Sequence, residues 1–123
     1  MKQDDLCGFG RCKVVYDVIS LVGDKWSVLV VNALGDRSRR FSEIKRTVDG
    51  ISQKMLTVTL RALERDGYVT RTVYPTVPPR VDYELTDLGR DLLGPVTELG
   101  RWALANHERI RQARTSYDAR ADG

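Results

Sequence analysis

The sequence predicts a mainly helical protein that carries a small β-hairpin. Three observations predict this fold class. Apolar residues recur at helical spacing in most of the chain before residue 67 and again after residue 86. Between these regions the period changes to two, since Val81, Tyr83 and Leu85 alternate with acidic residues. A loop with three prolines, Pro75 to Arg80, separates that run from a preceding β-branched and aromatic run.

Length and composition fit one globular domain. The chain has 123 residues, of which 41% are hydrophobic and 30% charged. The net charge of +3 permits a polyanionic partner without requiring one. The sequence has no membrane-spanning run, and its N-terminus lacks the apolar core of a signal peptide. We therefore expect a cytoplasmic protein of a bacterium or archaeon, without membrane partners.

The first two helices are predicted from apolar faces and capping residues. Residues 1–12 are interpreted as a flexible arm and residues 13–22 as a helix that Gly23 ends. Asp24 can cap the next helix, residues 25–34, which Gly35 closes. This second helix is apolar almost all round, so we expect it to be buried on most sides.

A short helix and a tight turn come next. Residues 36–40 are interpreted as a basic turn, and the segment 36–46 carries five cations against two acids. Ser42 is expected to cap a helix over 42–48 whose Ile44 and Val48 face inward. Asp49 and Gly50 then form a turn signal.

The segment Ser52 to Asp66 is predicted to be an amphipathic helix, capped by Ser52 and closed by Gly67. Its opposite face offers cations, a hydroxyl and methyl groups, which match the phosphates and base edges of a DNA major groove. A solvated helix face is the alternative from composition alone. The expected core side comprises Met55, Leu56, Leu60, Ala62 and Leu63, and the opposite side comprises Lys54, Thr57, Val58, Arg61 and Arg65.

The next segment is predicted to be a hairpin with a rigid tip. A helix-turn-helix followed by a two-stranded hairpin is a winged helix-turn-helix, and the tip would be its wing. Thr76 and Arg80 of this tip are candidates for minor-groove or phosphate contact. Arg80 could equally pair with Asp82 or Glu84.

A long helical stretch ends the domain. Thr86 is expected to cap it, and it runs to about residue 114 with a kink or break at Gly94 and Pro95. Its apolar stripe, including Trp102, is too long for so small a core to cover and therefore indicates a partner subunit. The expected division is thus an arm (1–12), a domain with dimerisation helices (13–114) and a frayed tail (115–123).

Several ordered motifs give the chain a resemblance to the HxlR-type winged-helix transcription regulators, which are related to MarR proteins. They are LVGDKW at Leu21 to Trp26 preceded by Cys12, RRFSEI at Arg39 to Ile44, GISQKML at Gly50 to Leu56, LRxLERDGYVxR at Leu60 to Arg71, and VYPxVPPRVxYxLTxxG at Val73 to Gly89. Together with the helix ending in Trp102, the resemblance covers about residues 12 to 105.

The resemblance implies a homodimer on a pseudo-palindromic operator of double-stranded DNA, usually as a repressor of nearby genes. Half-sites about one helical turn, ~34 Å, apart follow from two-fold symmetry. The candidate DNA-binding residues are Arg39, Ser52, Gln53, Lys54, Thr57, Val58, Arg61, Arg65, Thr76 and Arg80. The candidate dimer-interface residues are Val15, Ile19, Trp26, Leu92, Val96, Leu99 and Trp102.

Cys12 is a candidate redox sensor. It lies at an expected helix start between Arg11 and Lys13, where the helix dipole and adjacent cations lower a thiol pKa. The alternative is a small hydrophobe at the dimer seam. The resemblance implies that a cysteine at this position responds to oxidants or electrophiles such as quinones. Cys7 could react with it within or across the dimer, and no cysteine follows residue 12.

Other chemistry is sparse. His107 is the only histidine, so no metal site, cofactor or enzymatic activity is expected. Two alternatives remain beside thiol sensing. One is a regulator that responds to a small molecule held between the dimer helices near Trp26 and Trp102. The other is a winged-helix module for protein contacts.

Overall fold

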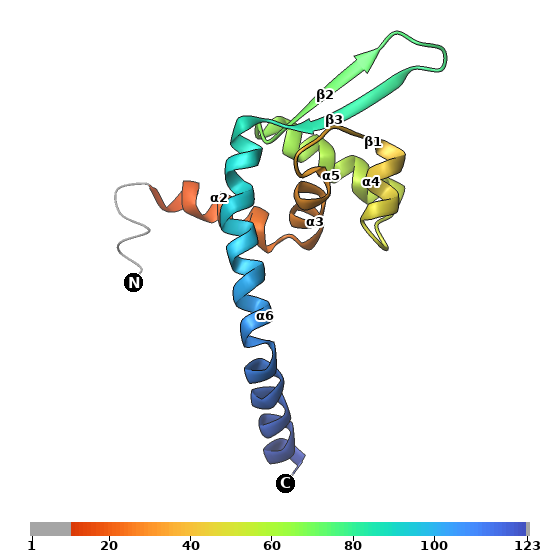
Figure 1. Cartoon of the computed structure of the whole chain (residues 1–123). Coiled ribbons are helices and arrows are strands. Elements are labelled where there is room, and N and C mark those ends of the chain that lie inside the picture. The colour runs from red at the N-terminus through yellow and green to blue at the C-terminus, as the bar shows by residue number, and fades with distance from the viewer. Residues whose placement is uncertain (1–10, 123) are drawn as a thin grey trace. The chain divides into compact units, whose positions relative to one another are not determined.

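The computed structural model describes residues 11–122 and contains a winged helix-turn-helix, as the sequence predicts (Figure 1). In chain order the elements are α2 (Arg11–Gly23), α3 (Lys25–Leu34), β1 (Arg39–Arg40), α4 (Phe41–Thr47), α5 (Gln53–Arg65), β2 (Val69–Tyr74), β3 (Arg80–Leu85) and α6 (Asp87–Asp122). The chain divides into two compact units, one up to Leu93 and one from Gly94 onward. Each unit is described by itself.

The hydrophobic core lies in the first unit and joins α3, α4, α5 and the sheet. Each of these elements contributes fully buried side chains, so the elements pack against one another through apolar contacts. The core residues are Val30, Val31, Ala33, Leu34, Ile44, Val48, Ile51, Leu56, Leu60, Leu63, Val69 and Leu85.

The starts and ends of α3 confirm the capping prediction. The Asp24 carboxylate accepts from the backbone N–H of Trp26 at 3.3 Å and from the Ser27 hydroxyl at 2.6 Å. Gly35 closes the helix at φ +43°. These local contacts satisfy polar groups at both ends of the helix. Five of its ten residues are buried and Leu29 is 39% exposed, so α3 is less buried than its composition predicts.

The short helix α4 starts one residue earlier than expected, and the prediction that Ser42 caps it is wrong. Arg40 occupies the cap position, and its backbone N–H donates to Glu43 Oε1 at 3.1 Å. Ile44 and Val48 face inward as predicted, and Gly50 forms the turn to α5 at φ +84°. The positive φ explains why glycine stands in this turn.

The helix α5 has the predicted cap, but its buried face is narrower than predicted. The Ser52 hydroxyl accepts from the Met55 backbone N–H at 3.0 Å. Met55 is 40% exposed and Ala62 is also exposed, so both predictions of a core position are wrong. The buried side is centred between Leu56 and Leu63, and at 100° per residue Met55 and Ala62 fall at its edge.

The sheet contains a short strand that the sequence does not predict. Residues 39 and 40, expected in a basic turn, form β1, which pairs antiparallel with β3. The strand order is β1-β3-β2, and β2 pairs with β3 from Val69 opposite Leu85 to Tyr74 opposite Arg80. A strand of two residues has no period of its own, so only its pairing with β3 reveals it.

Burial along β3 differs from the expected alternation. The apolar residues Val81 and Tyr83 are half-buried, whereas Asp82 is buried together with Leu85. The third strand explains this difference, because Arg40 of β1 lies directly opposite Asp82. Asp82 also receives two hydrogen bonds from Arg80, which partner its buried carboxylate.

The connection from the hairpin to α6 is tightly bonded. The Thr86 hydroxyl donates to the Gly67 carbonyl at 2.6 Å and accepts from the Gly89 backbone N–H at 3.1 Å, which confirms Thr86 as the cap of α6. The Tyr68 backbone N–H donates to the Leu63 carbonyl, and the Tyr68 carbonyl accepts from the Thr86 backbone N–H. These bonds join the ends of α5, the hairpin and α6.

The long helix α6 runs through Pro95 without a break, so of the two predicted outcomes, a kink or a break into two helices, the break is wrong. It also continues to Asp122, past the expected end near residue 114 and through the segment expected to be frayed. At the other end of the described chain, α2 starts at Arg11, two residues before its expected start. In the second unit, Leu99, Trp102 and Leu104 expose 53%, 58% and 82% of their surface.

Candidate nucleic-acid interface

The outer face of α5 carries the predicted groove-facing residues. Gln53, Lys54, Val58 and Arg61 are exposed, and Val58 leaves 52% of its surface free. Leu56, Leu60 and Leu63 anchor the opposite face in the core and thereby fix the direction of the outer face. A helix held in this way presents two cations, an amide and a methyl-bearing side chain together, the groups that contact phosphates and base edges.

Two of the candidate residues on α5 have local structural roles. Ser52 uses its hydroxyl oxygen as the helix cap. The Thr57 hydroxyl donates to the Gln53 carbonyl at 2.9 Å and the side chain is half-buried. The methyl group of Thr57 is therefore better suited to contact with a base than its donor is.

The wing differs from the prediction in the position of Arg80, which is the first residue of β3 and so lies at the base of the tip. Figure 1 shows the β2–β3 hairpin extending beyond helices α3 to α5. The Thr76 hydroxyl donates to the Pro78 carbonyl at 2.9 Å, and Val77 between them is completely exposed. Residues 75–79 carry no charge, so the tip itself offers an apolar surface.

Arg80 pairs with Asp82, which was one of the two alternatives from the sequence. Its Nε and Nη2 donate to the two carboxylate oxygens at 3.1 and 2.9 Å, and its guanidinium lies 5.1 Å from the centre of the Tyr74 ring. The hydrogen bonds from Arg80 lower the pKa of Asp82; burial opposes this shift, and the charges of Arg80 and Arg40 add to it.

The substitution Arg80→Ala is expected to reduce the acid dependence of stability. Since the pKa of Asp82 is lowered in the fold, its ion pair stabilises the protein above the unfolded pKa, and this contribution is lost as the pH falls through the folded value. The free energy of unfolding of the wild type, measured with urea, should therefore decrease below about pH 4. Arg80→Ala should start less stable at neutral pH and show a shallower decline; an unchanged pH profile would contradict the role of this pair.

Arg39 lies apart from the outer face of α5, on the short strand β1. It is half-buried opposite Tyr83, and its Nε atom is buried without a hydrogen-bond acceptor among the described residues. Sequence reasoning missed Tyr83, which lies opposite Arg39 on the sheet, and Arg71, which lies opposite Tyr83 on the strand beyond it. It also missed Lys45 and Arg46, exposed cations of α4. The basic run 36–46 was the available signal for the α4 cations, but no local pattern indicates the pairing with Tyr83.

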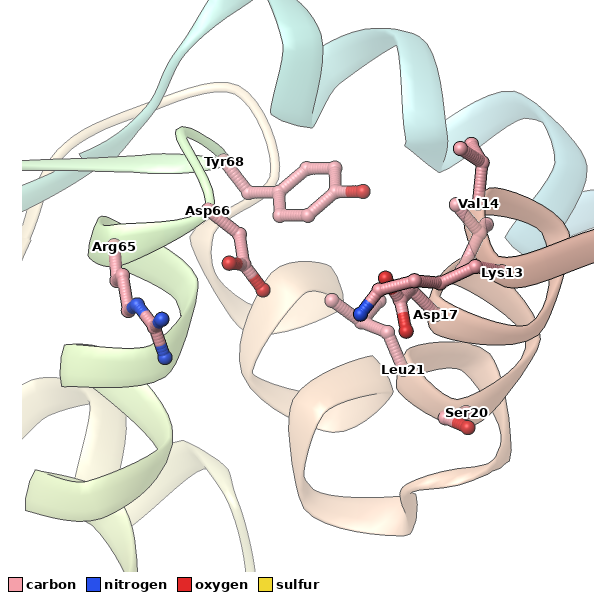
Figure 2. A pocket seen from close by; sticks show the side chains of 9 residues that line it. Lys13, Val14, Asp17, Ser20, Leu21, Arg65, Asp66 and Tyr68 are labelled. Carbon is pink, nitrogen blue, oxygen red and sulfur yellow. The ribbon is translucent and has the colours of Figure 1, made fainter. Parts of the chain in front are cut away.

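Arg65 lies at the C-terminal end of α5 and lines a cleft toward α2. The cleft has a volume of about 550 Å³ and lies within the first unit. Figure 2 shows Arg65, Asp66 and Tyr68 on one wall and side chains of α2 on the other, with Lys13 and Asp66 extending into the gap. Arg65 thus stands apart from the N-terminal part of α5, where Gln53 and Lys54 lie.

The candidate dimer residues fall into three groups. Ile19 of α2 is 54% exposed and Val15 is half-buried; Tyr16 and Val18, beside them on the helix, are also exposed. Trp26 packs against the core of its own chain. On α6, Leu92 belongs to the first unit and is half-buried. In the second unit Val96 is half-buried, and Leu99 and Trp102 are exposed.

The structure describes the backbone of only one of the two cysteines, Cys12. Cys7 lies outside the described residues. Cys12 is the second residue of α2, so its backbone lies in the first helical turn, where the helix dipole favours a thiolate.

Two further properties bear on function. Among residues 11–122, no three His, Cys, Asp or Glu side chains gather closely enough to hold a metal ion. In the same part of the chain, no helix combines the length and the apolar character that crossing a membrane requires.

Comparison with known proteins gives consistent matches. Residues 21–111 match the model of the HxlR-like helix-turn-helix family. The HTH-type transcriptional regulator YtfH of Escherichia coli is 42% identical over 90 residues, which cover 73% of this chain and 71% of YtfH.

Two of the similar solved structures are of a diamide-treated protein and of a redox regulator. The structure of diamide-treated YodB from Bacillus subtilis is 39% identical with a TM-score of 0.67, and the match covers 75% of this chain and 91% of YodB. The redox regulator HypR in its reduced form is 37% identical with a TM-score of 0.75, and the match covers 80% of this chain and 98% of HypR.

Proposed function

Since this chain belongs to the family of HxlR-like helix-turn-helix transcriptional regulators, we propose that it represses transcription by binding double-stranded DNA. The observation that carries the proposal is the outer face of α5. Lys54, Val58 and Arg61 are exposed there on a helix whose start is capped by Ser52 and whose other face is fixed in the core. This face has the size and chemistry to enter a major groove.

The DNA-binding form in this proposal is a homodimer. Exposed apolar side chains on α2 (Val14 and Ile19) and on the second unit (Leu99 and Trp102) support it, since exposed apolar surface favours association. Two-fold symmetry then pairs two α5 helices with two half-sites about one helical turn apart.

Selection of bound sequences from a random duplex pool tests the proposed operator. We expect the enriched sequences to share an inverted repeat whose half-site centres lie about one helical turn apart. Enrichment of a single unrepeated motif would contradict the two-fold arrangement, and no enrichment above a protein-free control would contradict sequence-specific binding.

Thiol sensing through Cys12 is the regulatory part of the proposal. It is supported by the position of Cys12 in the first turn of α2 between Arg11 and Lys13, and by the similarity to YodB and HypR. Oxidation would join Cys12 to Cys12 or Cys7 of the second copy, or to Cys7 of its own chain, while an electrophile such as a quinone would alkylate it. Each product would move α2 and thereby change the spacing of the two α5 helices.

Replacing Cys12 by serine is expected to make DNA binding insensitive to diamide. Diamide takes two electrons and two protons from two thiols and leaves a disulfide, which serine at position 12 cannot form. The measurement is a gel shift of wild type, Cys12→Ser and Cys7→Ser with and without diamide. Equal release of DNA from the wild type and Cys12→Ser would exclude Cys12 as the sensor.

A small-molecule effector is the alternative form of regulation, and one observation favours it. The cleft between α2 and α5 has the volume of a typical ligand pocket, ~300–1,000 Å³. The side chains of Lys13, Asp17, Arg65, Asp66 and Tyr68 line it without a hydrogen bond or ion pair within residues 11–122. This cleft differs from the expected place near Trp26 and Trp102. A compound that releases DNA from a Cys7→Ser/Cys12→Ser variant would support this alternative.

A further inference from the structure

Three side chains form a row across the sheet. Arg39 of β1 and Arg71 of β2 both lie directly opposite Tyr83 of β3. Residues directly opposite in an antiparallel pair project from the same face. Val69 and Leu85, two positions away from Arg71 and Tyr83, share this face and are buried in the core. The row therefore lies on the face of the sheet that packs on the helices, one step nearer to the hairpin tip than the buried pair.

A small cleft opens between this row and α5. Arg71 and Tyr83 line it from the sheet, and Thr57, Arg61 and Glu64 line it from the helix. Its volume is about 180 Å³, which is below the range of ~300–1,000 Å³ for pockets that enclose drug-sized ligands. A cleft of this size suits a single compact group.

Positive charge exceeds negative charge around the cleft. The row and the cleft together contain three guanidinium groups, those of Arg39, Arg61 and Arg71, and one carboxylate, that of Glu64. Glu64 Oε1 lies 3.6 Å from Arg71 Nε, with both side chains partly exposed, so their attraction is weak.

Two of the three guanidinium groups lack an acceptor. The Arg61 side chain makes no hydrogen bond or ion pair within residues 11–122. The Nε atom of Arg39 is buried without an acceptor in the same part of the chain. Arg61 lines the cleft and Arg39 does not, so an anion in the cleft would accept hydrogen bonds from an Arg61 guanidinium that has no acceptor in the described part of the chain.

We propose that this cleft binds one backbone phosphate of the DNA, and that Arg71 exchanges its contact with Glu64 for that phosphate. The inference rests on the proposed DNA binding. Thr57 and Arg61 belong both to the cleft and to the outer side of α5, so a duplex whose groove receives α5 brings its backbone to the cleft. The phosphate contact fixes the depth and direction of α5 in the groove, and Glu64 weakens binding by competing for Arg71.

Replacing Arg71 by glutamine is expected to remove one phosphate contact. The test measures binding of a labelled random-sequence duplex by fluorescence anisotropy at about 50 and 200 mM salt. The slope of log K against log salt should become shallower by about one, so the affinity loss relative to wild type should be about 3.5-fold larger at the lower salt. Arg109→Gln, which removes another exposed cation, hydrogen-bonded to Asn106 within α6, controls for net charge and should leave the slope unchanged.

Replacing Glu64 by glutamine should have the opposite effect. In the wild-type background, Glu64→Gln should tighten duplex binding several-fold. In the Arg71→Gln background the same substitution should give almost none of this gain, because there is no Arg71 for the Glu64 carboxylate to hold back from the phosphate. Equal gains in both backgrounds would mean that Glu64 acts only as a general repulsive charge, which would overturn the exchange.

Two further outcomes separate this inference from its premise. A wild type that binds no duplex overturns the proposed function and the phosphate site together. A wild type that binds duplex with the same slope as Arg71→Gln overturns the phosphate site alone. Free inorganic phosphate at millimolar concentration should shift the Arg71 Nε–H resonance in NMR spectra far less than duplex does. A large shift with free phosphate and none with duplex would make the occupant a free anion and overturn the proposal.

Discussion

Replacing Gly89 by alanine is expected to destabilise the folded protein by roughly 3 kcal/mol, at the upper end of the range for overpacking. A Cβ at this position would lie 2.2 Å from the Tyr68 carbonyl oxygen and 3.1 Å from Leu85 Cδ2. The oxygen cannot move away easily, because Tyr68 is bonded to Leu63 through its N–H and to Thr86 through this carbonyl. The clash therefore displaces the start of α6 from the joint between α5 and the hairpin.

Urea unfolding followed by circular dichroism measures this effect, and Gly100→Ala provides a matched control. Gly100 also lies within α6, but a Cβ there would meet nothing within 4 Å. Alanine at that site should stabilise the helix by about 1 kcal/mol, because it forms helices more readily than glycine. A loss below about 1 kcal/mol for Gly89→Ala would contradict the close packing at Tyr68.

Replacing Arg61 by alanine is expected to produce the largest loss of DNA binding among the α5 residues. Arg61 lies on the outer face and also lines the cleft with Arg71 and Tyr83, so its removal affects both groove and backbone contacts. If it contacts a base, operator binding should weaken by ~1–3 kcal/mol with relaxed specificity at one position. Lys54→Ala should also weaken binding, with an even loss over all sequences if its partner is a phosphate.

The measurement compares the affinities of both variants for the selected operator and for operators changed at single positions. Met55→Ala is the matched control on the same helix, since Met55 lies at the edge of the buried face rather than on the outer face. Thermal unfolding should show that Arg61→Ala and Lys54→Ala remain folded, because both side chains are exposed. Full affinity in both variants would mean that the opposite side of the helix, or another element, meets the DNA.

The sequence predicted the elements whose limits depend on neighbouring residues. Asp24 and Ser52 cap the helices that they precede, and Gly35 and Gly67 close them with positive φ angles. Capping is a contact within about three residues, so the local sequence indicates it well, although α4 is capped by Arg40 rather than by the predicted Ser42. The outer face of α5 was predictable for the same reason, because helical spacing alone separates Lys54, Val58 and Arg61 from the core leucines.

What the sequence did not predict depends on contacts between distant segments. The strand β1 exists only because residues 39 and 40 pair with Tyr83 and Asp82, more than forty positions later. The same pairing places Asp82 opposite Arg40 and covers it with β1, so that Asp82 is buried. The cleft beneath the hairpin combines α5 with β2 and β3, so no single segment indicates it. Pairing of this kind follows from the packed fold rather than from local preference.

The central claim is that the outer face of α5 binds DNA through several phosphates and base edges, and the salt dependence of binding by the full chain tests it most directly. Anisotropy of a labelled duplex should show log K falling linearly with log salt, with a slope of about −0.9 for each phosphate contacted. We expect a steep slope that becomes shallower in Arg61→Ala and Lys54→Ala. A flat response, with equal affinity for random and selected duplexes, would contradict the claim and favour a winged-helix module for protein contacts.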